Sequence, residues 1–312
     1  MNIIVIGAAG FIGKNLALFL AKDVNNSITL VDEKKEYFDD IRDINLSNVR
    51  IIQSGFLETT NFDQLLLGQD VVYHLVSTTI PTTSNQHIYD ELKANVDVTS
   101  LLLDSCVKNK IKQIVFISSG GTVYGEESSC PLSEDTPTNP ITSYGIQKIT
   151  IEKLLYLYNY MYNLDYRIVR LSNPYGPYQR PNGVLGALTT FVFKALKGED
   201  VIVYGDGSVV RDFIYIDDAI EAIINVTSTN SMYKTYNIGS GHGTSIRELL
   251  TLIEDTLNVN LNIKFTAGRR VDVPVNYLDI SRYEKEYGLL PKTNIHSGIC
   301  ETAEFLKKYY KI

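Results

Sequence analysis

The 312-residue sequence has little of what several classes of protein require. Its three cysteines, Cys106, Cys130 and Cys300, lie far apart and form no C-x-x-C pair. That pattern argues against a disulfide framework or a cysteine-bound zinc, and it fits a reducing compartment. Its four histidines include no pair at the spacing of helical metal ligands, so we expect no metal site.

Long apolar runs and an excess of basic residues are also missing. No segment approaches the ~18 apolar residues that a membrane span needs, and Met1 leads directly into Asn2–Ile6 without a basic n-region or a cleavage site. Lys and Arg number 29 against 36 Asp and Glu, a net charge of −7. We therefore expect a cytoplasmic protein that binds neither nucleic acid nor membrane.

The first half of the sequence alternates short β-branched runs with longer amphipathic segments, as βαβ units around a parallel sheet do. The clearest helical patterns cover 86–107 and 143–162. Strands are expected at 3–6, 28–31, 49–52, 71–74, 113–117 and 166–170. After Arg170 the sequence becomes turn-rich, and the further strands expected at 201–204 and 213–216 lack the earlier regularity.

These patterns predict an α/β fold, a Rossmann-type doubly wound parallel sheet with a smaller C-terminal α/β lobe. We expect residues 1–171, plus roughly 209–231, to form the dinucleotide-binding domain. Residues 172–208 and 232–312 would then form the second, substrate-binding lobe.

A glycine-rich segment follows the first expected strand. Its glycines, Gly7, Gly10 and Gly13, allow close approach of a pyrophosphate to a helix that begins at Phe11 and continues with Ile12. Asp32 ends the second strand 19 residues after Gly13, where its carboxylate can accept both hydroxyls of a ribose. Asp32 favours NAD, because it would repel a 2′-phosphate, whereas the neighbouring Lys34 and Lys35 keep NADP as an alternative.

Tyr144 and Lys148 stand four residues apart at the start of the 143–162 helix pattern, so they share one helix face. An ammonium beside a phenol favours the phenolate, so we expect Lys148 to lower the pKa of Tyr144 and to make it a general base. With 21 tyrosines in the chain, such a pair by itself is a common accident. Its position behind the segment 118–125, which follows the fifth strand, makes it specific.

Together with Asn95 and the segment 173–177, these motifs resemble the extended short-chain dehydrogenase/reductase family over almost the whole chain. Within that family the sequence looks most like nucleotide-diphosphate-sugar 4-epimerases and 4-ketoreductases. Three later segments carry this resemblance: Asn173-Pro174-Tyr175-Gly176-Pro177, Gly207 to Phe213, and Arg269-Arg270-Val271-Asp272. The resemblance implies that Arg211 and Arg269 bind the diphosphate and that Asn173 binds the diphosphate or the sugar.

Four features depart from the family pattern. Gly120 stands where the family has its catalytic Ser or Thr, so Thr122, or otherwise Ser119, is expected to supply that hydroxyl. Gly121-Thr122 replaces the Asp-Glu pair of the 4,6-dehydratases and disfavours that activity. Phe56 replaces the aspartate that contacts adenine, which weakens cofactor retention. Asn276 occupies the position that selects between hexoses, and its moderate size leaves plain and N-acetyl hexoses open.

The resemblance implies an NAD-dependent 4-epimerase of a UDP-hexose or UDP-N-acetylhexose, in which Tyr144 removes the proton of the 4-hydroxyl and a transient 4-keto sugar forms. One alternative is an NAD(P)H-dependent reductase of a dTDP- or UDP-4-keto-6-deoxyhexose. A remote alternative is a dinucleotide-sensing protein without chemistry. The family also forms homodimers through helices that correspond to 86–107 and 143–162, and it commonly supplies polysaccharide biosynthesis.

Overall fold

A computed structural model describes residues 1–41, 47–57, 62–79, 81, 84–126, 129–181, 186–228, 231–269 and 272–312. The chain divides into two units, called unit 1 and unit 2 below. Unit 1 comprises Met1–Ser118, Thr142–Val169 and Val226–Thr235. Unit 2 comprises Ser119–Ile141, Arg170–Asn225 and Tyr236–Ile312. The assignment of residues to a cofactor domain and a substrate domain stays a prediction.

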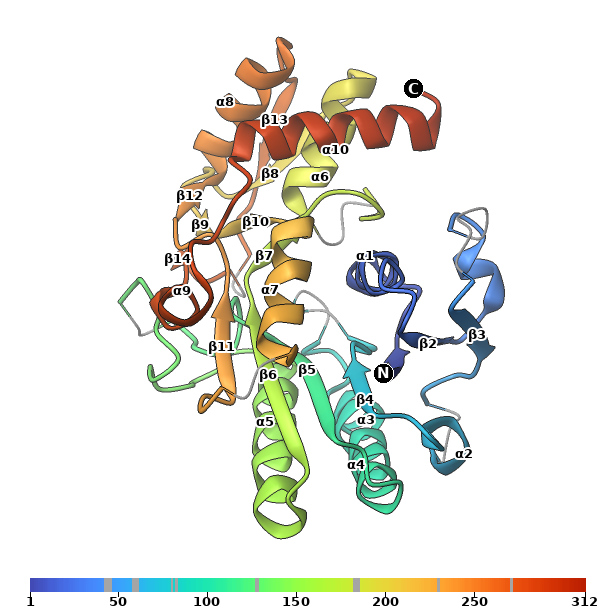
Figure 1. Ribbon diagram of the computed structural model, residues 1–312. Coiled ribbons are helices and arrows are strands. Elements are labelled where there is room, and N and C mark those ends of the chain that lie inside the picture. The colour runs from blue at the N-terminus through green and yellow to red at the C-terminus, as the bar shows by residue number, and fades with distance from the viewer. Residues whose placement is uncertain are drawn as a thin grey trace. The chain divides into compact units, whose positions relative to one another are not determined.

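The central sheet has seven strands in the order β11-β6-β5-β4-β1-β2-β3 (Figure 1). They are β1 (Asn2–Ile6), β2 (Ser27–Asp32), β3 (Val49–Gln53), β4 (Val71–His74), β5 (Gln113–Ser119), β6 (Asp165–Leu171) and β11 (Thr235–Ile238). Within the set of strands β1 to β5, every pairing of neighbours is parallel. This confirms the expected Rossmann-type fold and its six strands, and it adds β11 as a seventh.

The helices of unit 1 follow the predicted alternation. They are α1 (Phe11–Leu20), the 3-10 turn Lys35–Phe38, α2 (Asp63–Leu66), α3 (Ile88–Leu92), the π-helical turn Lys93–Asp97, α4 (Val98–Lys108) and α5 (Ser143–Tyr162). The prediction for 143–162 is confirmed in full. The helix predicted over 86–107 begins at Ile88 and contains the π-helical turn, which separates α3 from α4.

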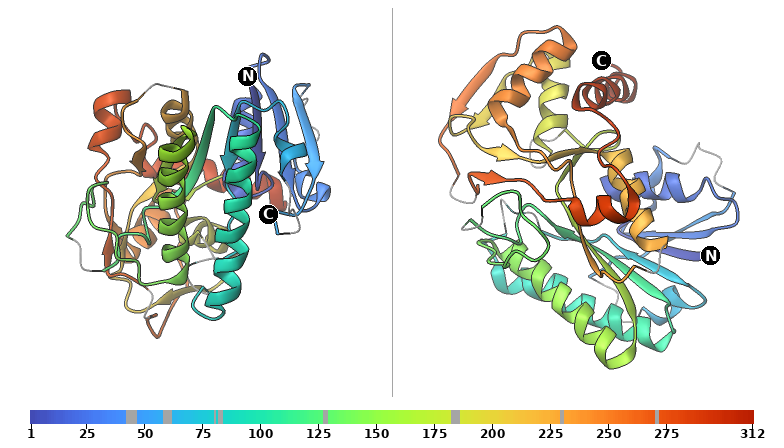
Figure 2. Two further views of the ribbon diagram at one scale, coloured as in Figure 1. Left: turned by 90° about the horizontal axis from the view of Figure 1, so that it is seen from below. Right: turned by 60° about the vertical axis from the view of Figure 1, so that its left-hand side comes forward.

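The core of unit 1 explains why these segments are helices and strands. Apolar side chains of the central strands, such as Ile114 and Phe116, are buried against Leu102 and Cys106 of α4 and against Ile151 and Leu155 of α5. Figure 2 shows α4 and α5 lying side by side, as their mutual contacts require. Strand β1 is buried on both faces, from Ile3 to Ile6, as a strand in a covered parallel sheet should be.

The sheet register places the candidate residues of unit 1 along one edge. Ile6 pairs with Val31 of β2 and with His74 of β4, so the carboxyl ends of these three strands lie at the same level. Gly7 follows β1 directly, and Asp32 is the last residue of β2. Open α/β sheets bind ligands beyond this edge.

Unit 2 is built around three small sheets, β10-β7, β12-β9-β14 and β13-β8. Their strands are β7 (Asn173–Tyr175), β8 (Val201–Tyr204), β9 (Val210–Arg211), β10 (Phe213–Tyr215), β12 (Thr244–Ser245), β13 (Ile263–Thr266) and β14 (Val275–Asn276). The helices are α6 (Ala187–Lys197), α7 (Ile216–Ser228), α8 (Ile246–Leu257), α9 (Ser281–Tyr287) and α10 (Ile295–Tyr310). Helix α10 packs on α6 and α8 (Figure 1). The strand expected at 201–204 is confirmed, and the next one ends at Tyr215 because Ile216 begins α7.

No helix among the described residues is long and apolar enough to cross a membrane. In the same ranges, no group of three His, Cys, Asp or Glu side chains could hold a metal ion. Cys106, Cys130 and Cys300 are free thiols, and Cys106 is buried.

Candidate active site

The turn after β1 is shaped by its glycines. Gly7 has φ +85°, and a Cβ there would lie 3.0 Å from the backbone nitrogen of Val76. A Cβ at Gly13 would lie 2.6 Å from the carbonyl oxygen of Ala8. At Gly10 the nearest atom to an added Cβ is the Gly7 carbonyl oxygen, 3.5 Å away. Gly7 and Gly13 are therefore needed for the turn itself, whereas Gly10 leaves room beside the backbone.

The amino end of α1 is available to an anion. Gly10 is the N-cap residue, and no side chain within the described chain caps the first turn, which carries Phe11, Ile12 and Gly13. The N–H groups at such a helix end lack partners within the helix and attract negative charge. The room at Gly10 and these donors together form a place that fits a diphosphate.

Asp32 adds a carboxylate to the same turn. Its Oδ2 accepts a hydrogen bond of 2.8 Å from the backbone N–H of Ala9, and its Oδ1 accepts one of 2.8 Å from the N–H of Glu33. The first contact ties the end of β2 to the glycine turn. A half-buried carboxylate beside an anion-binding turn is the arrangement that holds a ribose and its attached phosphate.

Phe56, which takes the place of an expected aspartate, packs into the core of unit 1. Its ring stacks on the His74 ring at 5.2 Å between centroids and lies 5.6 Å from that of Phe62. An apolar ring offers no hydrogen-bond acceptor at this position. Residue 56 therefore cannot offer a carboxylate to the adenine amino group.

Tyr144 and Lys148 lie one turn apart near the start of α5. The Lys148 ammonium donates to the carbonyl oxygen of Ile117 at 2.9 Å, and it lies 5.4 Å from the centroid of the Tyr144 ring. Thr142 caps the helix through its hydroxyl, which accepts from the N–H of Gly145 at 3.2 Å. The cap fixes the start of α5, and the carbonyl contact holds the Lys148 side chain in place.

Burial controls the ionisation of this pair. It raises the pKa of the Tyr144 phenol to about 12 and lowers the pKa of the Lys148 ammonium to about 8, because a buried site disfavours either charge. The raised pKa of Tyr144 runs against the lowering expected from Lys148, and burial is its cause. An added positive charge is needed to favour the phenolate near neutral pH.

The segment after β5 explains why residue 120 is a glycine. The N–H of Gly120 donates to the carbonyl oxygen of Leu171 at 2.8 Å. A Cβ at Gly120 would lie 2.6 Å from Cδ1 of Leu278 and 3.1 Å from the carbonyl oxygen of Arg170. Leu278 therefore fills the space that a serine or threonine side chain would need.

Two unpaired polar atoms lie around Gly120 in unit 2. Asn276 is 1% exposed, and its Nδ2 donates to the Gly120 carbonyl oxygen at 3.3 Å. Its Oδ1 and the Oγ1 of Thr122 are buried without a hydrogen-bond partner among the described residues. Buried polar atoms nearly always find a partner, so these two point to a ligand or to ordered water. Ser119 is half-buried at the end of β5.

Arg211 and Arg269 converge on Asp272. An Arg211 Nη2 lies 3.7 Å from Asp272 Oδ1, and Arg269 Nε donates to Oδ2 at 3.0 Å. The Arg269 guanidinium also covers the Tyr204 ring, 4.2 Å from its centroid. Two cations share one carboxylate, which leaves a net positive charge for an anionic ligand. Arg270 and Val271 of the predicted segment lie outside the described residues.

Asn173 is tied to the strand that carries Arg211. Its Nδ2 and its backbone N–H both donate to the carbonyl oxygen of Asp212 at 3.0 Å. The structure thus groups Asn173 with Arg211, and Arg211 with Arg269, in unit 2. It groups the glycine turn with Asp32, and Tyr144 with Lys148, in unit 1.

Asp212 is a buried carboxylate to which the sequence assigned no role of its own. It is fully buried and accepts from the N–H of Ser240 at 2.6 Å, from the Ser240 hydroxyl at 2.8 Å and from the N–H of Leu278 at 3.2 Å. Burial raises the pKa of Asp212. The residue thereby joins the strand of Arg211 to Leu278, the residue that packs on Gly120.

Asp212→Ala is expected to lower the free energy of unfolding by about 2–4 kcal/mol, because it leaves the buried donors of Ser240 and Leu278 without a hydrogen-bond acceptor. Asp212→Asn keeps the shape and one acceptor, so its loss should be smaller. Urea unfolding of both variants measures the difference. Equal stability of Asp212→Ala and the unaltered protein would contradict this role.

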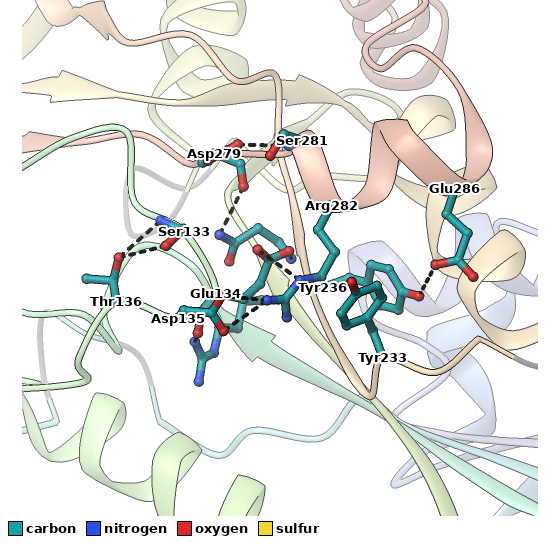
Figure 3. Close-up of polar contacts among 12 residues, drawn as sticks. Ser133, Glu134, Asp135, Thr136, Tyr233, Tyr236, Asp279, Ser281, Arg282 and Glu286 are labelled. Carbon is teal, nitrogen blue, oxygen red and sulfur yellow. Dashed lines mark hydrogen bonds and ion pairs between the residues drawn. The ribbon is translucent and has the colours of Figure 1, made fainter.

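A second cluster, drawn in Figure 3, joins Glu134 and Asp135 to Arg282. Nη2 of Arg282 on α9 donates to both carboxylate oxygens of Asp135 at 2.9 Å, and Arg282 Nε lies 3.5 Å from Glu134 Oε2. The other oxygen of Glu134 accepts from the N–H of Asn237 at 2.9 Å. Burial raises the pKa of Glu134. Sequence reasoning missed this cluster because Asp135 and Arg282 are 147 residues apart.

The Rossmann-type sheet, with its glycine turn and Asp32, is typical of an NAD-dependent enzyme. The chain belongs to the NAD dependent epimerase/dehydratase family, whose model matches residues 3–239. This confirms the predicted family and the prediction of an NAD-dependent enzyme.

Among its relatives, the UDP-glucose 4-epimerase of Mycolicibacterium smegmatis is 30% identical, over 98% of this chain and 99% of that protein. The dTDP-4-dehydro-6-deoxyglucose reductase of Escherichia coli is 29% identical, over 96% of this chain and 95% of that protein. The crystal structure of UDP-glucuronic acid 4-epimerase from Bacillus cereus, in complex with UDP-glucuronic acid and NAD, matches with a TM-score of 0.90. It is 28% identical and covers 99% of this chain and 100% of that chain.

Proposed function

We propose that the protein is an NAD-dependent nucleotide-diphosphate-sugar 4-epimerase that acts on a UDP-hexose or a UDP-N-acetylhexose through a transient 4-keto sugar. The observation that carries this proposal is the pair of half-buried Tyr144 and buried Lys148, in the unit that also contains the glycine turn and Asp32. The names of the Mycolicibacterium and Bacillus relatives support it.

The residues of unit 1 fit a dinucleotide. The space at Gly10 and the amino end of α1 would accept the diphosphate, and Asp32 the adenosine ribose. NADP is disfavoured because the carboxylate of Asp32 would repel a 2′-phosphate. When bound, NAD supplies a hydride acceptor for C4 and a positive charge that lowers the pKa of a nearby phenol.

Each candidate site residue has its own role in this proposal. Tyr144 accepts the proton of the sugar 4-hydroxyl and returns it, and Lys148 stabilises the phenolate and binds a ribose hydroxyl. The Thr122 hydroxyl, buried and unpaired, donates to the sugar oxygen as charge develops there, with Ser119 as the alternative donor. Arg211, Arg269 and Asn173 hold the nucleotide diphosphate, and Asn276 contacts the hexose.

A second candidate is reduction of a 4-keto-6-deoxy sugar nucleotide by an exchangeable NAD(P)H. Phe56 favours it, because an adenine without a carboxylate partner is held less tightly and the cofactor can leave after each turnover. The name of the Escherichia coli relative supports this candidate as well.

One experiment separates the two functions. The purified protein is offered UDP-glucose, UDP-N-acetylglucosamine and dTDP-4-keto-6-deoxyglucose, with and without NADH or NADPH. Products are followed by NMR and the reduced cofactor by its absorbance. The epimerase interconverts 4-epimers and consumes no reduced cofactor. A reductase would leave the hexoses untouched and consume one NAD(P)H per keto sugar.

We also propose a homodimer formed by α4 and α5. Apolar side chains on these neighbouring helices are exposed in the chain, among them Leu101, Ile146, Leu157, Tyr160 and Met161. Exposed apolar side chains that gather over two adjacent helices are typical of a helix-bundle interface.

Leu157→Asp is therefore expected to yield monomers in sedimentation velocity, because it buries a charge in the interface of the dimer. Leu289→Asp is the matched control, since Leu289 is exposed in unit 2 and lies outside α4 and α5. It should leave the dimer intact. A monomeric unaltered protein, or a dimeric Leu157→Asp variant, would refute the interface.

A cytoplasmic location and a role in polysaccharide biosynthesis complete the proposal. The three free thiols fit a reducing compartment. Sugar nucleotides are activated donors, and a 4-epimerase changes which hexose such a donor carries.

A further inference from the structure

A buried carboxylate continues the row of Tyr144 and Lys148 on α5. Glu152 lies one turn beyond Lys148 and is 5% exposed. Its Oε1 accepts a hydrogen bond of 2.5 Å from the hydroxyl of Ser118, which is itself buried. Ser118 follows Ile117, whose carbonyl oxygen binds the Lys148 ammonium. Lys148 and Glu152, one turn apart on α5, thus bond to the consecutive residues Ile117 and Ser118 of β5.

Several groups act on Lys148, and Glu152 is the carboxylate among them. Burial lowers the pKa of His74 on β4 to about 3, and the positive charge of Lys148 acts in the same direction, so the His74 ring stays neutral at working pH. Tyr144 and the Phe116 ring, 4.6 Å away, also face Lys148. From α3, Glu91 accepts from Gln147 rather than from Lys148. Glu152 attracts the ammonium and raises its pKa against the effect of burial.

The surroundings of Glu152 hold its carboxylate in place. Ser118 donates to it from β5, and its charge acts on Tyr166 of β6. Burial and the negative charges of its surroundings raise the pKa of Tyr166, so that phenol stays neutral. The Ser118 hydroxyl is thus the donor that holds the Glu152 carboxylate.

We propose that Glu152 is a positioning residue that keeps Lys148 protonated and oriented towards Tyr144. The proposal rests on the proposed function, because it assigns the charge on Lys148 to the proton transfer at Tyr144. It assigns Ser118 as the donor that fixes Glu152. Without the carboxylate, Lys148 would lose its proton at a lower pH, and Tyr144 would lose its neighbouring cation.

Glu152→Gln keeps the size of the side chain and an oxygen for the Ser118 hydroxyl, and it removes the charge. We expect the alkaline limb of the kcat/KM profile to move to lower pH by on the order of one unit, a tenfold loss of activity at pH values above the limb. KM for the sugar nucleotide should stay unchanged. Glu304→Gln is the matched control, because Glu304 is exposed on α10. An unmoved alkaline limb in Glu152→Gln would overturn the proposal.

A second readout does not depend on turnover. Lysine labelled with ¹³C at Cε gives an NMR signal whose pH titration reports the ammonium pKa, and a Lys148→Met variant identifies the signal of Lys148. We expect its midpoint to fall in Glu152→Gln and to stay in Glu304→Gln. If the midpoint falls while no sugar nucleotide is converted by the unaltered protein, the proposed function fails and the Glu152–Lys148 coupling stands. If epimerisation is found and the midpoint does not move, the coupling is refuted and the function stands.

Ser118→Ala keeps the test decisive if Glu152→Gln does not fold. Loss of the hydroxyl donor frees the Glu152 carboxylate to leave its place beside the α5 row, so the Lys148 midpoint should move in the same direction by a smaller amount. A Lys148 midpoint that is the same in Ser118→Ala and in the unaltered protein would overturn the proposal.

Discussion

Tyr144→Phe is expected to lower kcat by about 10²–10⁴-fold and to leave the affinity for the sugar nucleotide almost unchanged. The variant removes only the phenol oxygen, so the ring keeps its place 5.4 Å from the Lys148 ammonium. No other change is made to the groups that bind a nucleotide diphosphate. Steady-state kinetics give kcat, and calorimetric titration with UDP gives the affinity.

Tyr156→Phe on the same helix is the control. Tyr156 is 62% exposed, so the loss of its hydroxyl should change neither quantity. Activity retained in Tyr144→Phe would remove Tyr144 from the proton transfer. A loss of UDP affinity that equals the loss of kcat would instead make Tyr144 a binding residue.

Gly13→Ala and Gly10→Ala are expected to separate folding from cofactor binding. An added Cβ at Gly13 meets backbone atoms of Ala8 at 2.6–2.7 Å, so the turn must shift. We expect the free energy of unfolding to fall by about 2 kcal/mol and NAD binding to be lost with the turn. At Gly10 the nearest contact is 3.5 Å, and the N-cap change costs at most about 1 kcal/mol. NAD affinity should nevertheless fall by about tenfold or more, because the methyl group fills the space of the diphosphate.

Urea unfolding and calorimetric titration with NAD distinguish the two variants. Gly10→Ala should unfold close to the unaltered protein and bind NAD weakly, whereas Gly13→Ala should fail in both measurements. Normal NAD affinity in Gly10→Ala would contradict the assignment of the turn to the cofactor.

Local spacing accounts for the parts of the fold that could be predicted. Buried strands such as β1 and β4 are short apolar runs, and α5 is a continuous amphipathic pattern, so each can be recognised within a few residues. Strand β11 was not predicted because its four residues include the polar Thr235 and Asn237. The strand that it pairs with, β6, is also distant in the sequence. The π-helical turn between α3 and α4 leaves no mark in an apolar pattern.

The same distinction applies to the candidate site. The glycine turn, Asp32 and the pair Tyr144–Lys148 depend on spacings within one or two elements, which a sequence displays. Asp212 and Glu134 depend on partners that the chain brings from far away, Leu278 and Arg282. Glu152 lay within a predicted helix, but its significance came from Ser118 on another element. Burial also reversed the expected direction of the Tyr144 pKa, because the sequence shows charges and not the loss of solvent.

The most direct test of the central claim follows the hydrogen on C4. UDP-glucose, or UDP-N-acetylglucosamine, carrying deuterium at C4 is incubated with the protein in ordinary water, and the 4-epimer is analysed by NMR. We expect the epimer to form with deuterium retained at C4 and no free reduced cofactor to accumulate. Appearance of the label in free NAD(P)H, or its exchange with solvent, would contradict an epimerisation that returns the same hydride to the sugar.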